Sequence, residues 1–154
     1  MTDFYEILPL CNQLDQLARQ RGIALEATPG NRMCFEGQLY RVLFERGNAV
    51  ALVDDLASLP VDPSAMLYIE DWQEHPHCVS IPSVEDLLYL IRETTSLFPT
   101  LTPGVQATRE VWQIQHPSID PIVDAPLLQA LLQAALRILE QNPSSQQAQK
   151  GWER

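Results

Sequence analysis

The sequence predicts an α+β domain, in which an antiparallel sheet of four or five strands, arranged as a meander, packs with three main helices. Residues 3–21, 83–95 and 125–141 repeat apolar side chains at helical spacing, whereas residues 39–45 alternate between two faces as a strand does, within a series of short strand-like segments. The connections between those strands are too short for parallel crossovers, which need a dozen or more residues. We expect a single domain over residues 1–142 and a disordered polar tail, 143–154.

The first predicted helix, residues 3–21, has an apolar stripe of side chains three and four positions apart. Asp3 and Glu6 have the spacing of a capping box, and Gly22 fits a C-terminal stop. Pro9 lacks the N–H that would bond the Tyr5 carbonyl, so we expect a kink there or a start near Pro9. The stripe consists of Phe4, Ile7, Leu8, Cys11, Leu14 and Ala18.

Strands are predicted next, at 23–28, 33–36, 39–45 and 49–53. Pro29-Gly30-Asn31 is a turn signal after the first of them, and Arg46-Gly47-Asn48 marks a hairpin between the last two. Residues 56–65 read as a loop, followed by strands at 66–70 and 78–81.

Ser83 is the expected N-cap of the helix 83–95, with Glu85 and Asp86 in the first turn, where the helix dipole favours acids. Residues 96–124 are harder to interpret. Thr102-Pro103 suggests a helix over 103–110, yet residues 110–115 alternate like a strand. Asp124 is the expected cap of the last helix, 125–141, with Pro126 in its first turn. The wide leucine face of that helix packs in the core or forms a partner or homodimer interface.

The formal net charge is −10, with twenty acidic and ten basic residues. Without a cluster of Lys and Arg, the chain is not expected to bind nucleic acid or an anionic membrane. The charge is local: residues 47–91 contain eight acids and no Lys or Arg, while the flanking segments are nearly balanced. This window is either a solvated face or an electrostatic docking surface for a basic partner. The candidate binding residues are Asp54, Asp55, Glu70, Asp71, Trp72 and Glu74.

Trp72 lies among these acids, in EDWQE, and two interpretations stay open. An aromatic ring among carboxylates suits a surface that receives Arg or Lys. Alternatively, Trp72 anchors the end of the strand 66–70 on the core.

Glu74-His75-Pro76-His77-Cys78 is the best candidate for chemistry, because imidazole and thiolate are zinc ligands. The spacing matches no strong zinc motif, so His75, His77 and Cys78 are only a weak metal candidate beside the interpretation as a polar loop. No catalytic residue is assigned and no cofactor is predicted, since the glycine-rich phosphate motifs and GxSxG are absent.

Three widely spaced cysteines without a CxxC, an acidic start and no long apolar run lead us to expect a cytoplasmic protein with reduced thiols. The predicted function is a non-enzymatic acidic binding module, such as an assembly chaperone, adaptor or inhibitor, for a protein with a basic surface. The alternative is a small metal-dependent or small-molecule-binding enzyme that uses the His75/His77/Cys78 loop. The order of helix, three-strand meander, helix and terminal helix in a small acidic protein is similar in outline to secretion-chaperone-like α+β folds, a likeness of architecture and charge only.

Overall fold

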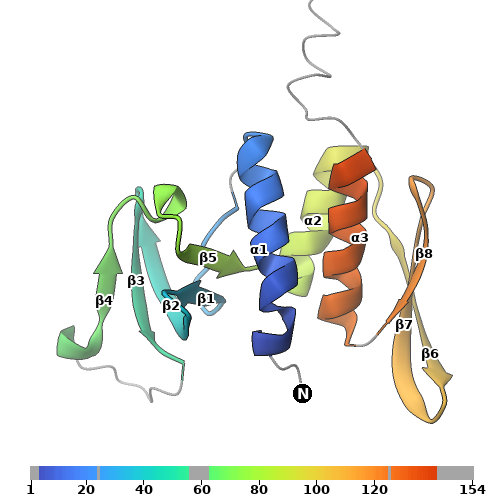
Figure 1. The fold of residues 1–154 in the computed structure, drawn as a ribbon, viewed down its shortest axis with the longest axis horizontal. Coiled ribbons are helices and arrows are strands. Elements are labelled where there is room, and N and C mark those ends of the chain that lie inside the picture. Colours follow the sequence, from blue (N-terminus) through green and yellow to red (C-terminus); the bar gives the residue numbers. More distant parts are fainter. Residues whose placement is uncertain (1–3, 24, 56–62, 125, 142–154) are drawn as a thin grey trace, which may run out of the picture. The chain divides into compact units, whose positions relative to one another are not determined.

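The computed structural model describes residues 4–23, 25–55, 63–124 and 126–141. These residues belong to two compact units: residues 24–82 form one, and residues 1–23 and 83–154 form the other. Among the described residues there are three α-helices and two antiparallel sheets, of five and three strands (Figure 1). The predicted α+β class is therefore confirmed. The single domain stays a prediction, and the tail 143–154 lies outside the described residues.

The unit 24–82 holds the five-stranded sheet, in the spatial order β4-β3-β2-β1-β5. All neighbouring strands are antiparallel, and β5 returns to pair with β1 after the meander of the first four. The predicted hairpin between the second and third strands is confirmed, with Gly47 at a φ of 60° in its turn. The strands are β1 (Arg32–Phe35), β2 (Gln38–Arg46), β3 (Ala49–Asp54), β4 (Leu67–Ile69) and β5 (Cys78–Ile81).

The strand predicted at residues 23–28 is wrong, because residues 25–28 join no ladder. Their polar groups are bonded by side chains instead: the Ser80 hydroxyl donates to the Glu26 carbonyl at 3.1 Å, and the Gln73 amide to the Leu25 carbonyl at 3.2 Å. Residues 56–62 of the predicted loop lie outside the described residues, and Pro63–Ala65 form a short 3-10 helix.

One hydrophobic cluster of this unit lies on one face of the sheet. β3 is buried along Ala49–Val53, which accounts for its unbroken apolar sequence. The buried members of the core are Ala27, Met33, Val42, Val50, Leu52, Ile69, Trp72 and Cys78.

The other unit holds the helices α1 (Phe4–Gln20), α2 (Val84–Thr95) and α3 (Leu127–Gln141) and a three-stranded sheet of β6 (Thr100–Gln106), β7 (Arg109–His116) and β8 (Ile119–Asp124). Helix α3 contacts α1 and α2 and also packs on β7 and β8, so it lies between α1 and the sheet (Figure 1). Its leucine-rich face is therefore core. The buried side chains of α3 are Leu128, Ala130, Leu131, Leu132, Ala134, Ala135, Leu136, Ile138 and Leu139.

The helix ends follow local sequence signals. Ser83 and Asp86 form a reciprocal capping box at 3.1 and 3.0 Å, and Gly22 ends α1 at a φ of 70°. Helix α1 begins at Phe4 and runs through Pro9, so the predicted start near Pro9 is wrong. The last helix begins later than predicted, at Leu127, and Asp124 is the last residue of β8. Its carboxylate accepts hydrogen bonds from the Gln129 and Gln133 side chains of α3, at 3.1 and 2.5 Å, rather than from the first backbone N–H groups of the helix in the bonds described. Asp3 lies outside the described residues.

The helix predicted at 103–110 is wrong, since β6 and β7 form a hairpin there, and the alternation at 110–115 belongs to β7. Gln106 pairs with Arg109 across a two-residue turn, so counting along the ladder puts Pro103 at a non-hydrogen-bonded position of an edge strand. Its missing N–H therefore costs no ladder bond. The turn residues Ala107 and Thr108 have φ values of 51° and 63°. Neither is the Gly or Asn that marks such a turn.

Candidate functional site

The candidate site is the segment 70–77, which connects β4 to β5, the two edge strands of the five-stranded sheet. Ile69 is paired with Val50 near the start of β3, whereas Cys78 is paired with Phe35 at the end of β1. The segment therefore crosses from one edge of the sheet to the other and supplies Trp72 to the core on the way.

Backbone hydrogen bonds hold the segment along its length. The Trp72 N–H donates to the Asn48 carbonyl at 3.2 Å, and the His75 N–H to the Trp72 carbonyl at 3.1 Å. At the far end, the Glu36 N–H donates to the His77 carbonyl at 3.1 Å. Asp71 takes up a left-handed conformation, with a φ of 52°, just before the single 3-10 turn Trp72–Glu74. The side chains of this segment are thus presented from a backbone that is tied to the sheet at both ends.

Of the two alternatives predicted for Trp72, a surface ring or an anchor in the core, the structure has the core anchor. Its side chain is 1% exposed, and its indole Nε1 donates to Glu45 Oε2 at 3.1 Å. A buried ring offers no face to an incoming cation, which corrects the prediction of Trp72 as a binding residue. Trp72 instead fixes the segment that presents the neighbouring acids.

Three of the predicted acids lie within five residues of one another on this segment. Glu70, Asp71 and Glu74 are exposed, and none of them forms a salt bridge with a described residue. The exposed Glu45 joins them through its bond to Trp72. We call Glu45, Glu70, Asp71 and Glu74 the acidic surface. The nearest base in sequence, Arg46, is also exposed and pairs with none of the described acids.

Asp54 and Asp55 do not belong to this surface. Asp54 is the last residue of β3, opposite Tyr40, and Asp55 follows it, whereas Glu70 and Asp71 follow a strand that pairs with the beginning of β3. Asp55 is also partly neutralised, because the Arg32 guanidinium bonds its carboxylate at 3.0 Å. The predicted docking window is thus divided by the fold.

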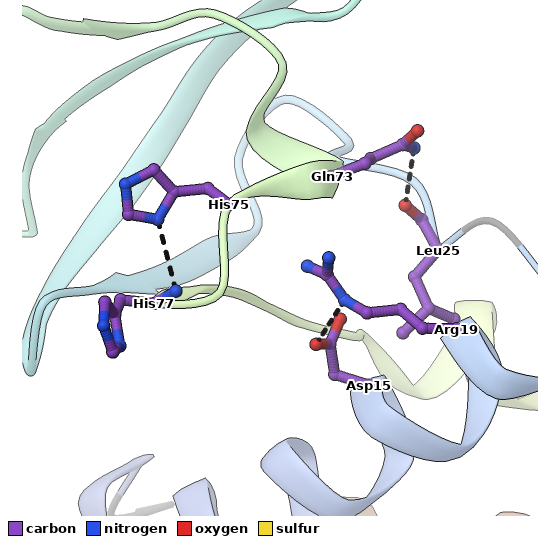
Figure 2. Close-up of polar contacts among 6 residues, drawn as sticks. All are labelled: Asp15, Arg19, Leu25, Gln73, His75 and His77. Carbon is purple, nitrogen blue, oxygen red and sulfur yellow. Dashed lines mark hydrogen bonds and ion pairs between the residues drawn. The ribbon is translucent and has the colours of Figure 1, made fainter.

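His75, His77 and Cys78 do not converge. His75 Nδ1 accepts the His77 N–H at 3.2 Å (Figure 2). The His75 ring packs 5.1 Å from that of Phe35. The exposed His77 ring lies 6.0 Å from His75. The Cys78 thiol points into the core, where its Sγ lies 3.1 Å from Met33 Sδ. Among the described residues, no group of three or more His, Cys, Asp or Glu is placed to hold a metal ion.

The cysteines resemble structural rather than reactive thiols. Cys11, Cys34 and Cys78 are all free and buried. Burial raises the pKa of the Cys34 thiol, and the backbone bond to Gly37 offsets this only in part. An activated thiolate needs the opposite shift.

One buried carboxylate lies in the other unit, on α1. Asp15 is 8% exposed and accepts a hydrogen bond from Arg19 Nε at 2.7 Å, one helical turn along (Figure 2). Burial raises the pKa of Asp15, although the Arg19 hydrogen bond and charge pull it down. A shallow hollow of about 160 Å³ between α1 and α3 is lined by three glutamines, two leucines and a single titratable residue, Glu140. These features describe the packing of the helices.

Glu45 is the member of the acidic surface that the sequence did not reveal, because it lies outside the window 47–91. The predicted hairpin contained the signal: strand pairing places residue 45 opposite residue 50, and residue 50 opposite 69, immediately before Glu70. Register, once known, brings the two acids to the same end of the sheet.

No protein-family model, curated protein or solved structure matches this chain. The outline similarity to secretion-chaperone-like folds therefore stays a prediction. Within the described ranges, no helix is both long enough and apolar enough to span a membrane.

Proposed function

We propose that this chain is a non-enzymatic protein-binding module, of the assembly-chaperone, adaptor or inhibitor kind, whose acidic surface engages a basic surface of a partner protein. One observation supports this most: Glu70, Asp71 and Glu74 are exposed on a hydrogen-bonded segment and form no salt bridge within the described part of the chain.

The charge of the whole unit points the same way. Residues 24–82 contain nine acidic and three basic residues, and one of those bases, Arg32, is engaged with Asp55. Exposed carboxylates attract Arg and Lys over a Debye length and bond guanidinium groups directly on contact. Because the segment is held in place before binding, less conformational entropy is lost when a partner docks. Electrostatic complementarity of this kind contributes mainly to partner selection and to the association rate.

The test uses a neutralising triple variant, Glu70→Gln, Asp71→Asn and Glu74→Gln. Asparagine is chosen at position 71 because it tolerates the left-handed backbone there. The control triple, Glu110→Gln, Asp120→Asn and Glu140→Gln, removes the same charge from exposed positions in the other unit. Both are compared with the unmodified chain for binding to a fluorescent peptide of alternating arginine and serine.

We expect the acidic-surface triple to weaken peptide binding about 10- to 100-fold at low salt, since each exposed pair contributes up to about 1 kcal/mol. The control triple should change binding less than about threefold, which is the long-range effect of net charge alone. Equal losses in both triples would show that the peptide senses only total charge, and would contradict the proposal.

A further inference from the structure

A second surface feature lies in the other unit, where α2 ends. Helix α2 stops at Ser96, whose φ is 69° and whose N–H bonds the Arg92 carbonyl. The chain then turns back, so that the Phe98 ring packs edge-on against Tyr89 of α2 at 5.9 Å. Three large apolar side chains are left half-exposed there: Tyr89 at 47%, Leu97 at 54% and Phe98 at 51%. We call them the α2 patch.

The patch is held in a fixed arrangement. Thr95 Oγ1 donates to the Ile91 carbonyl at 2.7 Å and accepts the Leu97 N–H at 3.3 Å. It also lies 3.0 Å from Nε2 of the buried His116, which ties the end of α2 to β7. A patch ordered before binding loses little entropy when it is covered.

Charges flank the patch in a self-complementary way. Glu85 is exposed in the first turn of α2 and Arg92 in the last. The Arg92 guanidinium carbon lies 5.4 Å from the centre of the Phe98 ring, and Arg92 forms no salt bridge with a described residue. Along one exposed face of α2 the order is therefore Glu85, Tyr89 and Arg92, and the Phe98 ring packs beside Tyr89 and Arg92.

We infer that this face binds a second copy of the chain, with the two α2 helices antiparallel. A two-fold axis between Leu88 and Tyr89 places Arg92 of each copy opposite Glu85 of the other, and Tyr89 opposite Leu88. An interface of this symmetry needs one self-complementary patch, and the charge order along α2 provides it. Arg92 and Glu85 thus pair twice, on either side of Leu88 and Tyr89 of the two copies.

The self-association is weak. Three half-exposed side chains cover much less than the roughly 800 Å² per partner of a standard interface. Because all these residues lie in the unit 1–23 and 83–154, the inference does not rest on the acidic surface.

The test is sedimentation equilibrium of the full chain over a concentration series. We expect the mean mass to rise from 17.4 kDa toward twice that value. Arg92→Glu and Glu85→Arg should each lower the association constant at least about tenfold, because each places like charges in contact. The double variant should restore it to within about threefold, since the pair is exchanged rather than lost. Arg137→Glu, which reverses an exposed charge on α3, should leave association unchanged.

Circular dichroism checks that each variant folds, because Glu85→Arg opposes the dipole of α2. If that variant unfolds, Phe98→Ser replaces it and should abolish association while Arg137→Glu does not. A mass that stays at 17.4 kDa at every concentration overturns the inference. So does association that survives Arg92→Glu or that the charge exchange fails to restore.

Discussion

Replacing Trp72 tests the interpretation of the segment 70–77 as a support for the acidic surface. Trp72 is 1% exposed, so Trp72→Ala removes a whole buried indole and should lower the free energy of unfolding by about 3–5 kcal/mol. Trp72→Phe keeps most of the apolar area. It loses the Nε1 hydrogen bond to Glu45 and part of the ring volume, so we expect a loss of about 1.5–3 kcal/mol.

The assay is urea unfolding followed by far-ultraviolet circular dichroism. Trp112→Phe is the matched control, because Trp112 is only half-buried on β7 and should lose less than Trp72→Phe. Glu45→Gln keeps an acceptor oxygen for the indole and should also lose less. A loss below about 1 kcal/mol for Trp72→Ala would refute the core role of this ring. So would unchanged stability combined with weaker binding of the arginine peptide.

Three further predictions concern stability. Burial raises the pKa of Asp15 above 3.8, so the folded state binds the proton more tightly than the unfolded state. The unfolding free energies of the unmodified chain and of Asp15→Asn are measured by urea titration at about pH 3.5 and about pH 7. The value for the unmodified chain minus that for the variant should fall as pH rises. A difference that rises with pH would contradict the raised pKa of Asp15. Ala107→Asn with Thr108→Gly places residues that tolerate the left-handed backbone at both turn positions, so the unfolding free energy should rise by about 0.5–2 kcal/mol. A double variant that is less stable than the unmodified chain would contradict this. His116→Ala removes the ring bonded by Thr95 and by the Ser118 N–H at 3.0 Å; thermal unfolding should show a loss of about 1–3 kcal/mol, and no change would contradict this bridge.

The sequence was most informative where local signals agree with the fold. The N-cap at Ser83 and the glycine of the β2–β3 hairpin form as predicted, because each depends on neighbours in the chain. The strand predicted at 78–81 also forms, and it pairs with β1. The prediction for residues 100–116 was wrong because their structure depends on how the sheet is assembled rather than on local signals. Pro103 is tolerated only because its strand lies at an edge, and Ala107-Thr108 occupies a turn without the usual residues. Neither fact can be read before the sheet is known.

In the candidate site, too, local features could be predicted from the sequence, whereas features set by the sheet could not. A count of charges located Glu70, Asp71 and Glu74, because exposure of acids is the rule for soluble proteins. It could not separate them from Asp54 and Asp55, which the register of β3 and β4 places at the other end of the sheet. Nor could it choose between the two positions of Trp72, since only the crossing of segment 70–77 over the sheet decides its burial.

The most direct test of the acidic surface is quantitative capture of partners from the host's own lysate. The unmodified chain, the acidic-surface triple and the control triple serve as three matched baits, at low and at high salt. We predict that proteins with basic surfaces are retained by the unmodified chain and the control triple, are lost at high salt, and are depleted at least about tenfold on the acidic-surface triple. Retention of the same partners, in the same amounts, by all three baits would contradict the claim that Glu70, Asp71 and Glu74 select the partner.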